Sequence, residues 1–121
     1  MAVLRVVANI EAQNPAEVAS FYQDLFQLDV LMDQGWIVTV GKQPAQGTSQ
    51  RPLQLSAASQ GGSDTPVPRL SIEVDDLDTV LARAQAQGIA IEYGPAQEPW
   101  GIRRFFVRDP TGQLVNVSCH T

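Results

Sequence analysis

One order of sequence patterns occurs twice in this chain: an alternating strand, an amphipathic helix and three more strands. Residues 4–10 (LRVVANI) carry apolar side chains at every second position, as a half-buried strand does. Asn14 and Pro15 then supply an N-cap and a first-turn proline for a helix. The apolar stripe of this helix consists of Val18, Phe21, Tyr22, Leu25 and Phe26. Three short strands are predicted next, at residues 29–32, 35–40 and 52–57.

The second copy follows a stretch rich in Gly, Ser and Pro at residues 59–68, which is the predicted linker. Residues 69–74 (RLSIEV) alternate again, and Asp75 and Asp76 precede a second helix that is predicted to end at Gly88. Strands are predicted at residues 89–93, 103–108 and 113–119, with a turn sequence at 109–112 (DPTG).

These patterns predict one α+β domain made of two βαβββ modules, residues 1–58 and 69–121. A chain of 121 residues is long enough to bury the core of such a domain. A second polar loop is predicted within the first module, at residues 43–52. A ferredoxin-like α/β sandwich, which would use fewer strands for the length, is the competing architecture.

The charge and the cysteine content limit the partners and the compartment. A net charge of −5 disfavours nucleic acid and anionic membrane surfaces as partners. It is compatible with a neutral or cationic ligand, although solubility is the commoner reason for net charge. Cys119 is the single cysteine, so no internal disulfide can form, and a buried, inert thiol is expected. With no signal-peptide pattern and no apolar run of about 20 residues, a cytoplasmic protein is expected.

Strand alternation also predicts what each face of the sheet carries, because successive side chains point to opposite faces. Val6, Ala8 and Ile10 should pack on the first helix. Leu70, Ile72 and Val74 should pack on the second, as should Val115, Val117 and Cys119. The opposite face would then receive a largely polar set: Arg5, Val7, Asn9, Arg69, Ser71, Glu73, Leu114, Asn116, Ser118 and His120.

This polar face either meets water or lines a ligand site. Arg5 and Arg69 could bind a carboxylate or phosphate, although pairing with Glu73 would equally explain either arginine. Asn116 offers both a donor and an acceptor. His120, the only histidine, could act as a base near neutral pH, but the end of a chain tends to fray.

The remaining candidate ligand-binding residues are two tryptophans and one of two adjacent arginines. Trp36 and Trp100 could stack on a flat ligand or belong to the core, and Trp100, between Pro99 and Gly101, is the better ligand contact. Arg103 and Arg104 must point to opposite faces of their strand, so at most one of them, taken as Arg104, can serve a cleft.

Three stretches give the chain a family resemblance: residues 14–28 (NPAEVASFYQDLFQL), 70–78 (LSIEVDDLD) and 98–117 (EPWGIRRFFVRDPTGQLVNV). In this order they resemble the vicinal-oxygen-chelate superfamily of glyoxalases, bleomycin-resistance proteins and extradiol dioxygenases. The resemblance implies an open, cup-shaped mixed sheet with helices on its convex face. It also implies a homodimer, in which the cleft is built within one chain or across two.

The resemblance also implies four metal-ligand positions, and this sequence departs from them. The aligned positions read Val7, Arg69 and Asn116, and residues 53–57 contain no Glu, Asp or His. A divalent metal needs several converging N, O or S donors. We therefore expect no metal and no cofactor.

Two functions are compatible with these features of the sequence. The first is a metal-independent binding protein of the bleomycin-resistance type, which sequesters an aromatic or cationic organic ligand. The second is a lyase, isomerase or dioxygenase-like enzyme with a non-standard site that uses Arg69, Glu73, Asn116 or His120.

Overall fold

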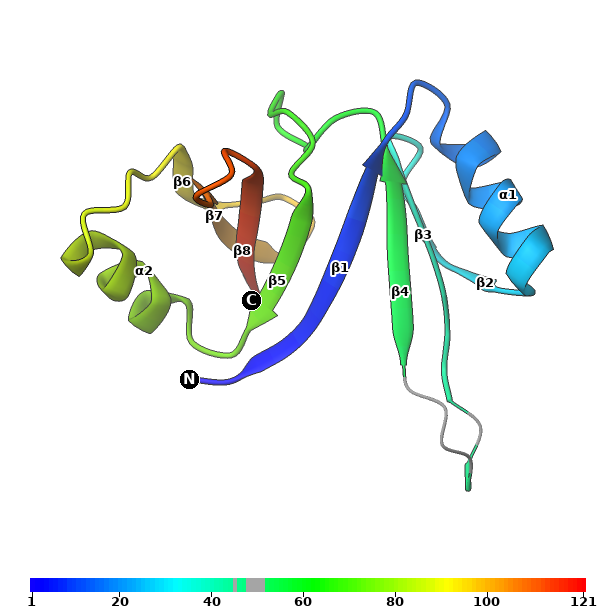
Figure 1. Ribbon diagram of the computed structural model, residues 1–121, viewed down its shortest axis with the longest axis horizontal. Coiled ribbons are helices and arrows are strands. Elements are labelled where there is room, and N and C mark those ends of the chain that lie inside the picture. The colour runs from blue at the N-terminus through cyan, green and yellow to red at the C-terminus, as the bar shows by residue number, and fades with distance from the viewer. Residues whose placement is uncertain (45, 48–51) are drawn as a thin grey trace. The chain divides into compact units, whose positions relative to one another are not determined.

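The computed structural model describes residues 1–44, 46–47 and 52–121 (Figure 1), so residues 45 and 48–51 of the predicted loop at 43–52 lie outside the described part. Its strands belong to one mixed sheet in the order β2-β3-β4-β1-β5-β8-β7-β6. The elements are β1 (Val3–Glu11), α1 (Pro15–Phe26), β2 (Asp29–Asp33), β3 (Ile37–Lys42), β4 (Leu53–Ala58), β5 (Leu70–Val74), α2 (Leu77–Ala86), β6 (Tyr93–Gln97), β7 (Ile102–Arg108) and β8 (Leu114–His120). The predicted α+β class with paired βαβββ modules is confirmed, and the eight strands rule out the ferredoxin-like alternative.

The chain divides into two compact units, which we call the first and second units. The first unit is Ala8–Val67, and the second unit is Met1–Val7 together with Pro68–Thr121. Within them the strands follow equivalent orders, β2-β3-β4-β1 and β6-β7-β8-β5. In each unit the strand before the helix pairs in parallel with the last strand of its module, β1 with β4 and β5 with β8.

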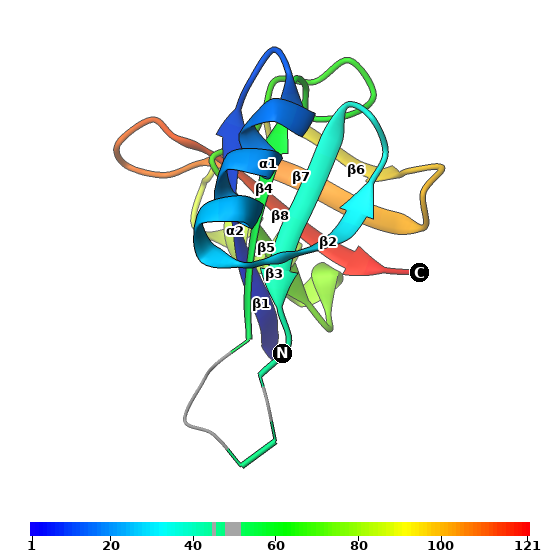
Figure 2. The same ribbon diagram turned by 90° about the vertical axis from the view of Figure 1, so that its right-hand side faces the viewer.

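Helix α1 begins as the sequence predicts. The Asn14 side chain accepts a hydrogen bond from Glu17 N at 3.3 Å, and Pro15 occupies the first turn. The helix packs against β2, β3 and β4 (Figure 2). The core beneath it contains Ala19, Leu28, Val38 and Val40.

The predicted burial of the α1 stripe is wrong in part. Tyr22 packs against the core, but Phe21, Leu25 and Phe26 are all more than half exposed. The helix buries the side that carries Pro15 and Ala19 instead, which turns much of the aromatic and aliphatic stripe away from the sheet.

The prediction that Val6 and Ala8 pack under the first helix is also wrong, because both residues are exposed. Ala8 and Ile10 do lie beside Leu55 and Ala57 in the sheet register, as alternation requires. The elements that α1 covers, however, are β2 to β4. On β1 it is Val7, predicted for the polar face, that is buried.

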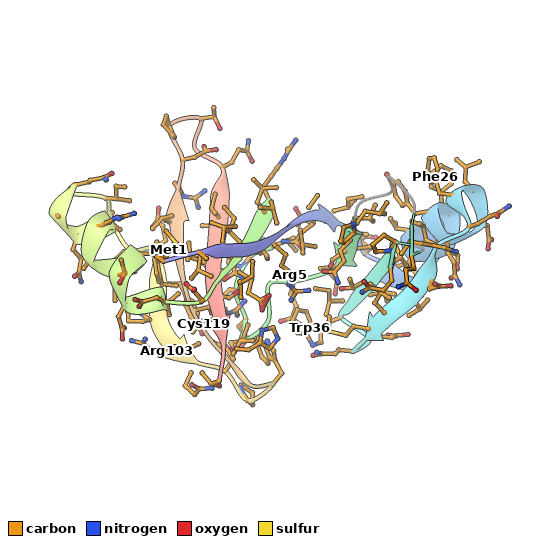
Figure 3. The ribbon with its side chains drawn as sticks, turned by 90° about the horizontal axis from the view of Figure 1, so that it is seen from below. Met1, Arg5, Phe26, Trp36, Arg103 and Cys119 are labelled. Atoms are coloured by element: carbon orange, nitrogen blue, oxygen red, sulfur yellow. The ribbon has the colours of Figure 1, made fainter. Side chains whose placement is uncertain are left out.

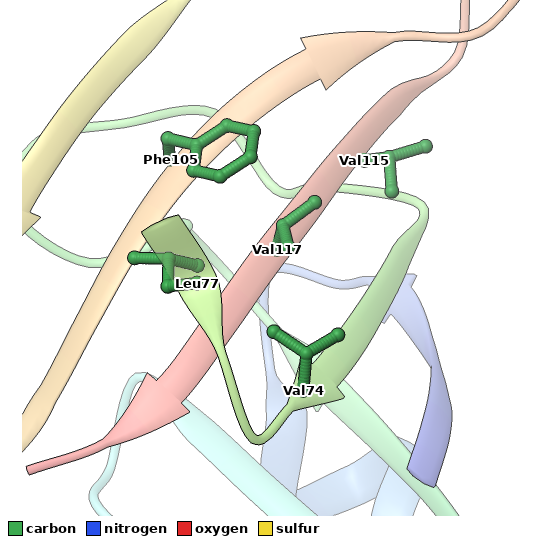
Figure 4. Close-up of a cluster of buried hydrophobic side chains, with 5 residues drawn as sticks. All are labelled: Val74, Leu77, Phe105, Val115 and Val117. Atoms are coloured by element: carbon green, nitrogen blue, oxygen red, sulfur yellow. The ribbon is translucent and has the colours of Figure 1, made fainter. Parts of the chain in front are cut away.

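The core of the second unit matches most of its prediction, although Leu70 is not part of it and Cys119, expected to be buried, is only partly buried. Val74, Val115 and Val117 from the sheet meet Leu77 of α2 and Phe105 of β7 (Figure 4). Helix α2 is capped by Asp76, whose carboxylate accepts hydrogen bonds from Thr79 N at 3.2 Å and from Thr79 Oγ1 at 2.6 Å. The alternation of β5 and β8 therefore sends Ile72, Val74, Val115 and Val117 to the helix side, and their polar residues lie on the other side together with Leu114.

One strand of the second unit differs from its prediction. The sixth strand is Tyr93–Gln97 rather than residues 89–93. It contains Gly94 and Pro95 and is irregular between Tyr93 and Ala96, and it pairs only with β7 at the end of the sheet. Proline is tolerated at such an edge position, where no neighbouring strand needs its N–H. The turn at residues 109–112 forms as predicted, with Asp109 Oδ1 accepting from Thr111 and Gln113.

In the part of the chain that the structure describes, neither helix is long and apolar enough to cross a membrane.

Candidate functional site

Polar side chains gather on one face of the sheet in the second unit, opposite α2. The register places Asn116 between Ser71 and Phe106, and it places Ser118 between Glu73 and Arg104. We call this surface the polar face. It consists of Ser71, Glu73, Asn116, Ser118, His120, Arg104 and Phe106, with Arg5 from the first half of β1. The faces predicted for β5 and β8 are therefore confirmed.

Glu73 connects three elements on this face. Its Oε1 lies 3.0 Å from Arg5 Nε, and its Oε2 contacts Nδ1 of His120 (Figure 3 labels Arg5). The Glu73 side chain is only 13% exposed, whereas that of His120 is 63% exposed. A carboxylate held in this way fixes the orientation of the imidazole and leaves the far edge of the ring accessible.

Asn116 carries a buried acceptor that is not used. Its Nδ2 donates to Ser71 Oγ at 3.1 Å, while Oδ1 has no hydrogen-bond partner among the described residues. The residue is 5% exposed. A buried polar atom without a partner costs about 1–3 kcal/mol, so native proteins usually pair it with protein, water or ligand.

Arg104 lies in a cage of aromatic rings beside the polar side chains. Its guanidinium carbon is 5.4 Å from the ring centroid of Tyr93, 5.1 Å from that of Trp100 and 4.8 Å from that of Phe106. Glu98 closes the cage, since its Oε1 lies 3.6 Å from Arg104 Nε and accepts from the Tyr93 hydroxyl at 2.5 Å. One ring face of Trp100, the predicted ligand-stacking residue, is thus in contact with the chain's own arginine.

The structure brings together most of the predicted site residues and separates others. Arg5, Ser71, Glu73, Arg104, Asn116, Ser118 and His120 share the polar face, and Trp100 joins them through Arg104. Asn9 and Trp36 belong to the first unit. Arg69 is exposed and lies near Asp109. The pKa of the Asp109 carboxyl is lowered mainly by a hydrogen bond from the Thr111 side chain, and the charge of Arg69 makes a smaller contribution in the same direction.

Sequence reasoning missed Glu98 and Tyr93. Glu98 is 3% exposed although it precedes a Pro-Trp-Gly sequence that is typical of a surface loop. Only the presence of a buried arginine could have suggested a buried acidic partner, and alternation alone does not tell which of Arg103 and Arg104 is buried. Arg103 does lie on the opposite side of β7, where it pairs with Asp78 at 2.7 Å.

The residues at the metal positions do not fit a metal centre. Val7 has no donor atom, Arg69 is cationic, and Asn116 offers a single neutral oxygen. Among the described residues, no three His, Cys, Asp or Glu side chains come close enough to hold an ion together. The carboxylate of Glu73 is already engaged by Arg5 and His120.

Comparison with known proteins gives one family match. The sequence profile of the Glyoxalase/Bleomycin resistance protein/Dioxygenase superfamily matches residues 6–117. No curated protein is a significant match to the sequence.

Solved structures resemble the chain over nearly its whole length. A Legionella pneumophila protein named as an NAD-dependent benzaldehyde dehydrogenase superposes with a TM-score of 0.75 at 19% identity, covering 97% of this chain and 100% of that one. A methylmalonyl-CoA epimerase gives 0.66 at 18% identity, covering 100% and 96%. A variant of the Streptomyces coelicolor methylmalonyl-CoA epimerase, in complex with 2-nitronate-propionyl-CoA, gives 0.68 at 15% identity, covering 99% and 96%. At these identities the likeness shows the fold.

Proposed function

Because the chain belongs to the Glyoxalase/Bleomycin resistance protein/Dioxygenase superfamily, we propose that it binds a small organic molecule on the polar face without a metal ion. The observation that carries this proposal is the buried Oδ1 of Asn116, which has no partner among the described residues. A ligand that donates an N–H or O–H to this oxygen would remove the cost of leaving it unpaired.

The surroundings of Asn116 favour a ligand that is neutral or cationic. The charges around it are paired, Glu73 with Arg5 and Arg104 with Glu98, so a neutral ligand meets no uncompensated charge. The net charge of −5 on the whole chain is compatible with a cationic one. An amine, amide or hydroxyl attached to an aromatic ring would bond Asn116 Oδ1 and pack against Trp100, which is partly exposed. Sequestration of a drug-like molecule of the bleomycin type is the corresponding activity.

The test is a thermal-shift screen of wild-type protein and an Asn116→Leu variant. The probes are bleomycin and a panel of small aromatic amines, amides and alcohols. Bound ligand raises the melting temperature in proportion to the logarithm of its concentration over Kd. We expect hits that shift the wild type and not the variant. Hits that shift both proteins equally would place the ligand elsewhere.

A metal measurement belongs with this screen. Protein purified without chelator should carry no stoichiometric Zn, Ni, Mn or Fe by mass spectrometry. One metal ion per chain would contradict the metal-free proposal.

A second candidate function is proton transfer, and the contact between Glu73 and His120 favours it. A neutral imidazole oriented by a carboxylate can take a proton from an acidic C–H and return one to the resulting carbanion. Several solved structures of the same fold are methylmalonyl-CoA epimerases. If the chain has such an activity, incubation with methylmalonyl-CoA in D₂O should place deuterium on the carbon between the two carbonyl groups. His120→Asn should abolish that exchange, and wild-type protein that catalyses no exchange would rule out this substrate.

A further inference from the structure

The first unit contains an apolar groove that none of the functions above uses. It has a volume of about 450 Å³ and is lined by Tyr22, Phe26, Gln27, Leu28, Lys42, Leu53 and Leu55. That volume lies within the range of sites that hold a small ligand, roughly 300–1,000 Å³. Of these seven described residues, five have aromatic or aliphatic side chains and none carries a carboxylate.

The groove arises where α1 ends. Gln27 takes a left-handed backbone conformation with φ of 56°, which turns the chain from the helix into β2. Tyr22 and Phe26 lie one turn apart at this end of the helix, with stacked rings 6.2 Å between centroids. Phe26 is exposed (labelled in Figure 3), as is Leu53 on β4, while Leu28 forms a buried wall. Water therefore covers apolar surface here that the fold itself does not bury.

Among the described residues that line the groove, Lys42 at the end of β3 is the one cation. Its Nζ lies 3.4 Å from the carbonyl oxygen of Gln27, and it pairs with no carboxylate in the described residues. Lys42 is also the only lysine of the sequence. An ammonium group with three donors and one long hydrogen bond keeps capacity for an anionic partner.

We propose that this groove binds an amphipathic monoanion, that is, an aliphatic chain or ring that bears one carboxylate. The apolar part would cover Phe26, Leu53 and Leu55, and the carboxylate would pair with Lys42. Charge complementarity selects this class: a neutral lipid would leave the ammonium unused, and a cation would be repelled by it. The site belongs to the first unit and does not depend on Asn116 or on the function proposed for the polar face.

The single lysine makes a direct test possible. Reductive methylation with ¹³C-formaldehyde labels only Lys42 and the N-terminal amine and preserves both positive charges. Decanoate, below its micelle concentration, is then titrated into the labelled full-length protein. We expect saturable movement of the Lys42 methyl signal in NMR spectra, while the N-terminal signal stays in place. A Lys42 signal that does not move would overturn the proposal.

Two comparisons separate the contribution of charge to decanoate binding from the hydrophobic contribution. Decanol, the neutral analogue, should bind about tenfold more weakly than decanoate, as expected for the loss of one charge-assisted hydrogen bond. Lys42→Gln should weaken decanoate by a similar factor when binding is followed by calorimetry, and Lys42→Arg should largely keep the affinity. Equal affinities for decanoate and decanol, or unchanged binding by Lys42→Gln, would refute the anion-binding role.

A failure of the groove proposal can be distinguished from a failure of the function proposed for the polar face. Asn116→Leu should leave decanoate binding unchanged, because Asn116 belongs to the second unit. If Asn116→Leu removed decanoate binding, the carboxylate site would not be the Lys42 groove and the inference would be wrong.

Discussion

Arg104 and Glu98 form an ion pair whose two side chains are almost completely buried, at 3% and 2% exposure. Three aromatic rings surround the guanidinium, and the Tyr93 hydroxyl donates to the same carboxylate oxygen that lies nearest the arginine. The pair is therefore part of a packed cluster rather than a surface contact. Removing one charge would leave the other buried without compensation.

We expect Arg104→Met to lower the free energy of unfolding by about 3–5 kcal/mol, measured by urea denaturation. The double variant Arg104→Met/Glu98→Leu should lose less than the sum of its single variants, because it leaves no unpaired charge. Arg103→Met is the matched control on the preceding residue, whose partner Asp78 is 78% exposed. It should change stability by at most about 1 kcal/mol. Equal effects of the two arginine variants would contradict the burial.

Phe105 and Phe21 test where the core lies. Phe105 is 0% exposed at the centre of the second-unit core, and Phe21 is 58% exposed on α1. Phe105→Ala should cost about 3–5 kcal/mol, because it removes apolar burial and leaves a cavity. Phe21→Ala should stay within about 0.5 kcal/mol in the monomer. A large loss from Phe21→Ala would show that another surface covers the helix.

Asn116→Leu separates binding from stability. The leucine side chain has the same branched shape and removes the unpaired Oδ1, so the free energy of unfolding should be unchanged or higher. Asn116→Ala should instead be destabilising, because it leaves a cavity at a buried position. Chemical denaturation of both variants checks this ranking. A leucine variant less stable than the alanine variant would mean that the hydrogen bond to Ser71 matters more than the unpaired acceptor.

Asp76 gives the α2 cap a defined pH dependence. Hydrogen bonds from the Thr79 side chain and then from its backbone lower the pKa of the Asp76 carboxyl below the ordinary 3.8. A carboxyl with a lowered folded-state pKa stabilises fully above its unfolded value, and that stabilisation is lost as pH falls through the folded value. Asp76→Asn, which caps but does not titrate, should therefore melt below the wild type at pH 7.

The gap in melting temperature between wild type and Asp76→Asn should close as the pH is lowered below about 4. Asp24→Asn is the control, because Asp24 is exposed in the last turn of α1 and therefore is not the N-cap of a helix. A gap that stays constant from pH 7 to pH 3 would show that the Asp76 charge plays no part.

The sequence predicted the fold well because most of its elements carry local signals. Asn14-Pro15 and Asp76 are strong helix starts, and the alternation in β5 and β8 follows burial on one side only. The strand predicted at residues 89–93 does not form: Ile91 packs against the core of the second unit, and Ile89 is exposed. The true strand, Tyr93–Gln97, contains Gly94-Pro95, which by itself indicates a break.

The sequence predicted only part of the candidate site. Alternation placed Ser71, Glu73, Asn116, Ser118 and His120 on one face, because period-two geometry needs no tertiary information. Alternation does not predict which of these side chains contact one another, because that depends on the distances between strands. The same limit hid the contact of Trp100 with Arg104 and the exposure of Phe26, since an apolar stripe has the same spacing whether or not the fold covers it.

Strand β1 has a consequence for how the protein unfolds. Its residues Val3–Val7 belong to the second unit and Ala8–Glu11 to the first, so one continuous strand supplies hydrogen-bonding partners to both. Neither unit keeps all of its strand residues if β1 detaches, so we expect heat or mechanical pulling on the N-terminus to disrupt both. A protein assembled from two similar modules should in this way melt in one calorimetric transition, with equal calorimetric and van't Hoff enthalpies.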